Sequence, residues 1–292
     1  KIIQLKGRVY SGDDDWVISL EELKGRGHTI TDAHLRARWD SVTPKSIYTL
    51  IYTSGTTGRP KGVITTHQSM LYVAEAVQSV NVIQESDVQL LVLPLAHVFG
   101  RVLMASWLQT RHELAFAESA TTLRENIQEV RPTLLCGVPR VFEKFYFEVV
   151  QGVANKGAIA QSLLVRALLF SKKTQKVGDN SAGQSGLNNI YQSGFRWALS
   201  KTIGRKMDEI LGGRIRLLIS GGAPLSQEIG WFFRNLGFVI LEGYGLTEST
   251  AATCVGRPDI TVVGSVGLPL PGTEIRLAAD AEVLIRGPGL MR

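Results

Sequence analysis

The chain has 292 residues with a formal net charge of +6, and 44% of its residues are hydrophobic. This composition excludes a disordered or low-complexity chain and supplies enough apolar side chains for one large domain or two modest ones. Two cysteines, Cys136 and Cys254, are too few for a disulfide framework or a cysteine-based metal site, so the sequence predicts a reducing, cytoplasmic setting.

The ends of the chain differ in pattern from its middle. Residues 1–44 predict a strand, a turn and an acidic helix, which we interpret as the end of a preceding N-terminal subdomain. Residues 45–263 predict an α/β core. From Gly264 the chain changes to short strands broken by proline and glycine, which predicts the start of a small β-subdomain at 264–292.

The core region alternates between apolar strands and amphipathic helices. Strands are expected at residues 47–53, 62–66, 88–95, 113–117, 133–138, 214–220 and 238–242. Helices are expected at residues 67–79, 98–109, 121–130 and 227–236. Since strands that run apolar without alternation are covered on both sides, the pattern predicts an α/β fold of layered parallel-sheet subdomains with helices on both faces. The most apolar stretch, 90–108, is broken by Pro94, His97 and Arg101 and is too short for a membrane span.

A basic helical insertion is expected at about residues 151–213. Between residues 151 and 216, Lys and Arg outnumber Asp and Glu by 11 to 3, while the rest of the chain is slightly acidic, and helices are expected near 159–176 and 187–211. Two interpretations stay open, a surface attracted to anionic lipid and a solvated helical face. A nucleic-acid surface is disfavoured, because the basic residues lack interleaved aromatic side chains of the stacking kind.

Glycine-rich loops follow three of the expected strands, after Thr53, Ser220 and Glu242. In parallel α/β sheets, ligands bind beyond the carboxyl ends of the strands, so three such loops predict one shared ligand site. The first loop, YTSGTTGRPKG from residue 52 to 62, has the composition of an anion cradle, with free backbone N–H groups, hydroxyl donors and the charge of Lys61. It is not the P-loop of kinases and small GTPases, because Pro60 precedes the lysine and glycine follows it.

This loop closely resembles the phosphate-loop signature of the adenylate-forming superfamily, which includes acyl-CoA synthetases, peptide-synthetase adenylation domains and luciferases. Four more segments resemble family motifs in the same order: PLAHVFG at 94–100 (acid pocket), SGGAPL at 220–225 (adenine side), EGYGLTES at 242–249 (nucleotide and magnesium) and GSVGLPLPG at 264–272. PRVFEK at 139–144, followed by the insertion, resembles the long-chain branch, most of all the bacterial long-chain fatty-acid–CoA ligases.

The resemblance implies a role for each matching residue. The implied ATP-binding residues are Thr53, Ser54, Gly55, Thr56, Thr57, Gly58, Lys61, Gly222, Ala223, Glu242, Gly243, Tyr244, Gly245 and Thr247. The implied Mg²⁺ ligands are Thr53 and Glu248, which offer the hard oxygen atoms that this ion requires. The implied acyl-pocket residues are His97, Val98, Gly100 and Gly221, and the implied catalytic residues are Lys61, His97, Thr247 and Glu248. Without its motif, His97 would be interpreted as a packed or partly exposed histidine after a strand. Because Pro94-Leu95-Ala96 precedes it, the resemblance favours a position beside the substrate carboxylate.

The implied reaction is ATP-dependent activation of a carboxylic acid, a long-chain fatty acid, to acyl-AMP and then acyl-CoA, with release of pyrophosphate and AMP. Mg²⁺ is the implied cofactor, and ATP and coenzyme A are the implied co-substrates. The substrate carboxylate is itself the nucleophile, so no covalent catalytic residue is required, and Cys136 is interpreted as a core residue. Two alternatives remain: an acyl-AMP ligase that serves a carrier protein, and a non-catalytic nucleotide-binding module.

The sequence also departs from the family pattern. Arg101 stands where some bacterial fatty-acid synthetases have a tryptophan gate, and Asp280-Ala281-Glu282 stands where an Asp-Gly-Glu turn is common. The ribose-binding aspartate and the lysine of the family's C-terminal domain cannot be assigned. We therefore expect the chain to be the large-domain part of such an enzyme, without its C-terminal domain, and to be a poor catalyst by itself.

Overall fold

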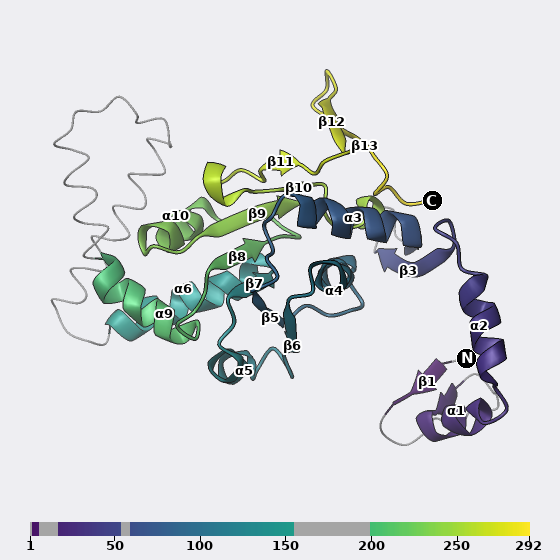
Figure 1. Ribbon diagram of the computed structural model, residues 1–292. Coiled ribbons are helices and arrows are strands. Elements are labelled where there is room, and N and C mark those ends of the chain that lie inside the picture. Colours follow the sequence, from purple (N-terminus) through teal and green to yellow (C-terminus); the bar gives the residue numbers. More distant parts are fainter. Residues whose placement is uncertain (1, 6–16, 54–58, 155–198) are drawn as a thin grey trace. The chain divides into compact units, whose positions relative to one another are not determined.

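The computed structural model describes residues 2–5, 17–53, 59–154 and 199–292 (Figure 1). The chain divides into two compact units, residues 1–46 and 47–292. The expected insertion helix at 159–176 lies outside the described residues, as does the part 187–198 of the one at 187–211. No helix within the described ranges is long and apolar enough to cross a bilayer.

The first unit is small and has little interior. Strand β1 (Ile2–Gln4) pairs in parallel with β2 (Val17–Ser19), and helices α1 (Leu20–Gly27) and α2 (Asp32–Asp40) follow. The Ser19 hydroxyl accepts a hydrogen bond from the N–H of Glu22 at 3.0 Å and so fixes the start of α1. The acidic helix is as predicted, whereas α2 was not predicted.

The second unit contains a seven-stranded sheet in the order β11-β10-β9-β8-β7-β5-β6. Its five parallel strands are β5 (Val88–Leu91), β6 (Glu113–Phe116), β7 (Leu134–Gly137), β8 (Leu217–Ser220) and β9 (Ile240–Tyr244). Two antiparallel strands, β10 (Cys254–Val255) and β11 (Leu268–Pro269), extend the sheet beyond β9. The predicted α/β fold with a largely parallel sheet is confirmed.

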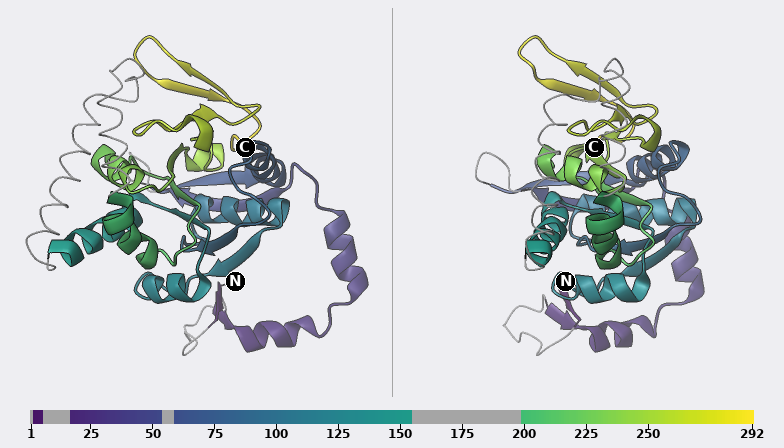
Figure 2. Two further views of the ribbon diagram at one scale, coloured as in Figure 1. Left: turned by 60° about the vertical axis from the view of Figure 1, so that its left-hand side comes forward. Right: turned by 90° about the vertical axis from the view of Figure 1, so that its left-hand side faces the viewer.

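Helices cover both faces of this sheet (Figure 2). Helices α3 (His67–Ser79) and α4 (Val98–Thr110) pack on one face. Helices α5 (Leu123–Val130), α6 (Pro139–Ala154), α9 (Arg205–Ile210) and α10 (Gln227–Asn235) pack on the other, with the π-helical turn η1 (Ser200–Gly204) leading into α9. The alternation of side chains along each strand divides the core, since Leu135 faces the α6 side and Leu134 and Cys136 face the α3 side.

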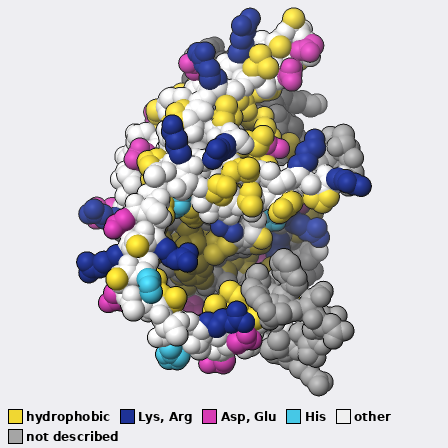
Figure 3. All heavy atoms as spheres, turned by 90° about the vertical axis from the view of Figure 1, so that its right-hand side faces the viewer, with side chains coloured by type: hydrophobic (Ala, Val, Ile, Leu, Met, Phe, Trp, Pro, Cys, Tyr) yellow, Lys and Arg dark blue, Asp and Glu magenta, His cyan; other side chains and the backbone are white. Residues whose placement is uncertain are grey.

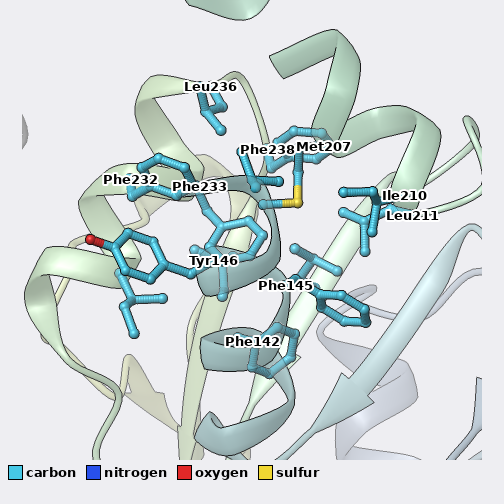
Figure 4. Packing of buried hydrophobic residues seen from close by; sticks show 14 of the residues in the cluster. Phe142, Phe145, Tyr146, Met207, Ile210, Leu211, Phe232, Phe233, Leu236 and Phe238 are labelled. Carbon is cyan, nitrogen blue, oxygen red and sulfur yellow. The ribbon is translucent and has the colours of Figure 1, made fainter. Parts of the chain in front are cut away.

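The core on the α6 side is aromatic (Figure 4). Phe142 of α6 meets Phe233 of α10 edge to face, and Tyr146 meets Phe232 in the same way. Full burial of each such ring contributes about 1.5–3 kcal/mol, and the edge-to-face geometry adds to it. Met207 of α9 is also fully buried here, although the sequence placed it in the basic insertion. Helix α6 was not predicted as an element of the core.

Two hairpins complete the second unit. Strands β3 (Ile47–Thr53) and β4 (Lys61–Thr66) pair antiparallel, and so do β12 (Glu274–Leu277) and β13 (Val283–Arg286). One face of β3 is apolar but exposed, with Leu50 at 51% and Tyr52 at 71%, and hydrophobic side chains reach the surface on the side drawn in Figure 3. Since β11 joins the main sheet, residues 264–292 are only partly separate from it, and the expected domain boundaries stay a prediction.

The strand order changes direction at β5, because β6 lies on one side of β5 and β7, β8 and β9 follow on the other. The helix after β5, α4, lies on one face, whereas the helix after β7, α6, lies on the other. The two connections therefore diverge at the carboxyl ends of neighbouring strands, which is where open α/β sheets bind ligands. The loops after β5, β8 and β9 all lie at this carboxyl edge.

Candidate functional site

The turn after β5 places His97 at the N-terminus of α4. The backbone N–H of His97 donates to the carbonyl of Pro94 at 3.1 Å, and its carbonyl accepts from the N–H of Arg101 at 3.4 Å. The Arg101 side chain stabilises the same turn, because its Nε donates a hydrogen bond to the Leu95 carbonyl at 2.7 Å. The turn ends strand β5 four residues earlier than predicted and leaves the His97 side chain exposed.

Two other predicted acyl-pocket residues in α4 point inward. Val98 is only 7% exposed and packs in the core on the α3 side. Gly100 is buried, and a Cβ atom there would lie 2.7 Å from the carbonyl oxygen of Pro94. Gly100 thus allows α4 to pack closely against the turn that carries His97, and the acyl-pocket assignment stays a prediction.

The loop after β8 is wedged among neighbouring loops. The N–H of Gly221 donates to the Gly137 carbonyl at 3.0 Å, and a Cβ atom on Gly221 would lie 3.1 Å from the ring of Phe99 in α4. Gly222 has a φ of +82°, which favours glycine, and both it and Ala223 are exposed. The two predicted adenine-side residues therefore lie at the surface of the carboxyl edge.

The end of β9 carries the buried carboxylate of Glu242. Its Oε1 accepts from the N–H of Gly264 at 2.9 Å, and its Oε2 accepts from the N–H of Leu225 at 3.3 Å. Burial raises the pKa of Glu242 above its ordinary value, and the two backbone hydrogen bonds act in the opposite direction. Gly243 and Tyr244, which follow it, are half-buried and pair with β10.

A tight loop follows β9 and presents Thr247 and Glu248. A Cβ atom on Gly245 would lie 1.5 Å from the carbonyl oxygen of Ala251, so the loop can fold back on itself only with glycine at this position. The Ser249 hydroxyl accepts from the N–H of Leu246 at 2.9 Å and holds the turn from inside. Thr247 and Glu248 lie in the resulting 3₁₀ turn, η2 (Thr247–Ser249), and both are half-buried.

The β3–β4 hairpin brings Thr53 and Lys61 together, since these residues are paired at its end. Strand β4 lies against η2, and the last two residues join them, because Met291 N–H donates to the Glu248 carbonyl and Arg292 N–H donates to the Ile64 carbonyl, at 2.8 and 3.0 Å. The connecting loop lies outside the described residues, so these predicted phosphate contacts are not located: Ser54, Gly55, Thr56, Thr57 and Gly58.

The donor atoms at this edge suit a magnesium ion. Thr53 offers a hydroxyl and Glu248 a carboxylate, both partly accessible, on the hairpin and on the turn that lies against it. Within the described residues, no group of three or more His, Cys, Asp or Glu side chains could hold a metal ion. Mg²⁺ commonly binds through one or two protein oxygens together with substrate phosphates and water, so this sparse set fits that ion.

Sequence reasoning missed two contributors to the site. Arg101 was noted only as a departure from the family pattern, but it fixes the His97 turn. Ser249 was included in a motif without a role, but it organises the turn that carries Glu248. Their hydrogen bonds run to backbone atoms nearby and, for Ser249, also to the Thr253 hydroxyl, and a serine or arginine near a loop carries no sequence signal for such bonds.

Comparison with known sequences identifies relatives of this chain. It matches the family described as "AMP-binding enzyme" over residues 4–292. It is 32% identical over 272 residues to the long-chain-fatty-acid–CoA ligase FadD15 of Mycobacterium bovis, which covers 92% of this chain and 44% of that protein. It is 36% identical over 255 residues to long chain acyl-CoA synthetase 1 of Arabidopsis thaliana, with coverage of 84% and 37%. The chain therefore spans less than half the length of these curated relatives.

Solved structures share the fold. The TM-score is 0.62 with o-succinylbenzoate CoA synthetase (MenE) from Bacillus subtilis in complex with its acyl-adenylate intermediate, at 19% identity, covering 95% of this chain and 47% of that one. It is 0.55 with the same enzyme in complex with ATP and magnesium ion, at 20% identity, covering 86% and 43%. It is 0.61 with VinN in complex with L-aspartate, at 21% identity, covering 94% and 59%. At these identities the likeness shows the fold alone.

Proposed function

The chain belongs to the AMP-binding enzyme family, and from this premise we propose that the protein activates a long-chain fatty acid with ATP and transfers the acyl group to coenzyme A. The relatives that are named long-chain-fatty-acid–CoA ligase and long chain acyl-CoA synthetase support the choice of acid. The structural neighbours MenE and VinN were solved with an acyl-adenylate intermediate and with L-aspartate, so the fold by itself does not favour a fatty acid.

One observation carries the proposal, the gathering of the motif residues at the carboxyl edge of the sheet. A Cβ atom on Gly221 would lie 3.1 Å from the Phe99 ring of α4 and 3.7 Å from the Gly243 carbonyl oxygen of β9, so the loops after β5, β8 and β9 lie close together there. The turn that carries Thr247 and Glu248 lies against the β4 strand that begins with Lys61. A hydroxyl, a carboxylate, an ammonium and an imidazole thus lie around glycine loops, which is a set of groups suited to a nucleotide triphosphate and a carboxylic acid.

The proposed chemistry has two steps. An oxygen of the fatty-acid carboxylate attacks the α-phosphorus of ATP, the bond to the β-phosphate bridge breaks, and pyrophosphate leaves. The coenzyme A thiol then loses its proton to solvent and attacks the acyl carbon, and the acyl–phosphate bond breaks to release AMP. Neither step needs a covalent enzyme intermediate, and burial raises the pKa of the Cys136 thiol far above neutrality, which disfavours it as a nucleophile.

The chain's own residues would position the reactants and neutralise charge. Lys61 would face the phosphates, Thr247 would donate to the α-phosphate, and exposed His97 would lie beside the carboxylate. Mg²⁺, held by Thr53 and Glu248 when bound, would neutralise phosphate oxygens. Such positioning and charge neutralisation account for most of the rate enhancement in phosphoryl-transfer sites.

The test is acid-dependent ATP–pyrophosphate exchange by the full-length protein, with saturated acids of increasing chain length. We expect exchange to rise toward long chains, and thioester to form when coenzyme A is added. Exchange with every acid but no thioester with coenzyme A would favour a carrier-protein acceptor. No exchange with any acid would overturn the proposal.

A peripheral membrane contact is part of the proposal, because long-chain acids reside in bilayers and the insertion is basic. We propose a cytoplasmic enzyme whose insertion attracts it to anionic lipid. Vesicles with and without anionic lipid, at low and high salt, test this contact. Binding that is indifferent to both variables would contradict it.

A further inference from the structure

We propose that Glu242 acts in this protein as a positioning residue, whose carboxylate joins three segments of the carboxyl edge. The segments are the loop 221–225 after β8, the end of β9 at 242–245, and the turn 262–264. This inference rests on the proposed function, since the first two segments contain the predicted adenine-side residues. It replaces the direct contact with ATP that the sequence implied for Glu242.

The carboxylate is fully engaged by the protein backbone. Glu242 is 9% exposed, and each of its two oxygens accepts an N–H from a different segment, Leu225 at 3.3 Å and Gly264 at 2.9 Å. Its own carbonyl accepts from the N–H of Gly256, the residue after the neighbouring strand β10, at 2.9 Å. A carboxylate that bridges two backbone donors fixes the distance between the segments that carry them.

The donor at Gly264 is held in place from the other side by α10. Arg234 donates to the carbonyl of Thr261 at 2.9 Å, and a Cβ atom on Gly230 would lie 2.7 Å from a methyl group of Val263. Gly264 has a φ of +83°, and a Cβ atom there would lie 2.5 Å from the Gln227 side chain. The turn 262–264 therefore packs against α10. If the Glu242 side chain moves, the Gly264 N–H has little freedom to move with it.

The donor at Leu225 is anchored as well. The Leu225 side chain is 5% exposed and packs in the core beside α10. Gly222 and Ala223 lie between strand β8 and Leu225. Both are exposed, so their position is not fixed by packing in the hydrophobic core. The Glu242 bond to Leu225 thus fixes one end of the loop that would face adenine, while Gly243 and Tyr244 extend directly from Glu242 itself.

The decisive variant is Glu242→Gln in the full-length protein. An amide has only one acceptor oxygen, so in either orientation one of the two N–H groups faces an NH₂ group and loses its bond. We expect amide hydrogen exchange at Leu225 or Gly264 to quicken by about tenfold or more, since an unsatisfied buried donor is costly. We also expect the KM for ATP in pyrophosphate exchange to rise by about tenfold, with kcat changed much less.

A second substrate, inosine triphosphate, distinguishes a positioning role of Glu242 from a direct contact between Glu242 and adenine. Inosine triphosphate lacks the 6-amino group through which adenine could donate to a carboxylate. A positioning role predicts that Glu242→Gln weakens the use of ATP and of inosine triphosphate by the same factor. A loss confined to ATP, with amide exchange at Leu225 and Gly264 unchanged, would overturn the inference.

Controls keep the two proposals apart. Glu274→Gln removes a carboxylate from an exposed ion pair with Arg286 and should change neither readout. If Glu242→Gln does not fold, Gly264→Ala perturbs the same hydrogen bond from its donor, and it should raise the KM for ATP in the same way. Amide exchange needs no substrate, so unchanged protection in Glu242→Gln would refute the positioning role even if the wild-type protein failed to activate any acid.

Discussion

The two edges of the main sheet are built on opposite physical principles. At the amino edge, the buried carboxylate of Asp87 accepts from Arg216 Nε at 3.0 Å, from the Thr133 hydroxyl at 2.7 Å and from the Gln84 N–H at 2.8 Å. These bonds tie together the starts of β5, β7 and β8. At the carboxyl edge, glycines allow close backbone contacts, and polar side chains such as His97 and Lys61 remain exposed. The buried carboxylate of the amino edge is satisfied within the fold, whereas the carboxyl edge leaves polar side chains exposed for a ligand.

A buried cluster of charged side chains therefore need not be a functional site. Burial raises the pKa of Asp87, but hydrogen bonds from Arg216, Gln84 and Thr133 and the positive charge of Arg216 together hold the pKa below its ordinary value. The shifted pKa reflects structural bonding, because these partners satisfy the carboxylate within the fold. The comparison predicts that changes at the amino edge reduce stability, and that changes at the carboxyl edge reduce activity.

The largest effect should come from Asp87→Ala. It removes the carboxylate that pairs with Arg216, whose side chain is 32% exposed and keeps its bond to the Val82 carbonyl, so we expect a loss of about 3 kcal/mol in unfolding free energy. Denaturant unfolding measures this loss. The fraction that stays folded should keep the wild-type KM for ATP. A raised KM for ATP without a loss of stability would contradict the purely structural role of the amino edge.

At the carboxyl edge, Glu248→Gln should have the largest effect on activity. Losing the anionic oxygen that would hold Mg²⁺ should reduce pyrophosphate exchange by about 100-fold or more, as does removal of other preorganised electrostatic groups. The midpoint of thermal unfolding should change little, because Glu248 is half-buried and its backbone carbonyl makes the contact with Met291. Undiminished exchange at saturating Mg²⁺ would remove Glu248 from the mechanism.

A smaller effect is expected from Gly100→Ala. The added methyl group would lie 2.7 Å from the Pro94 carbonyl, so the His97 turn must shift, at a cost of about 1–3 kcal/mol. The KM for the fatty acid should rise more than the KM for ATP. Gly152→Ala in α6 is the matched control, since a Cβ atom there meets nothing within 4 Å, and it should stabilise the helix by about 0.5–1 kcal/mol.

The smallest effect concerns pH and the amino edge. Burial lowers the pKa of His112 below its ordinary 6.5, against the opposing influence of Asp87. The unfolded chain therefore binds the proton more readily, so the stability contributed by neutral His112 is lost as the pH falls below about 6.5. Asp87, whose pKa is also lowered, adds a further loss below about 4.

Thermal unfolding between pH 8 and 3 measures both losses. In the variant His112→Gln, the midpoint of thermal unfolding should fall less than in the wild type as the pH drops below about 6.5. The further loss below about pH 4 should be unchanged. A profile that is identical for wild type and variant would show that burial of His112 does not affect stability in this range.

The α/β fold with a largely parallel sheet follows from the order of the amino acids alone, because uninterrupted apolar strands are stable only when helices cover both sides of the sheet. So does the start of α3, where the hydroxyls of Thr66 and Ser69 cap each other's N–H groups at 3.2 and 3.1 Å. Short-range patterns of this kind act within a few residues, so they can be read from the order of the amino acids. The glycine motifs after Ser220 and Glu242 likewise predicted two loops of the carboxyl edge, whereas the motif after Thr53 follows a strand of a separate antiparallel hairpin and lies outside the described residues.

Which side chains at that edge are exposed, and which are bonded within the fold, depends on the packing of segments that are distant in the sequence. Val98 and Glu242 stand in motifs that predicted ligand contacts, yet one packs in the core and the other bonds Leu225 and Gly264. The aromatic residues of α6 gave no signal of belonging to the same core as Met207, which lies more than fifty positions away. Such partners are set by the packing of distant segments, and a sequence pattern with a period of two or four residues carries no information about them.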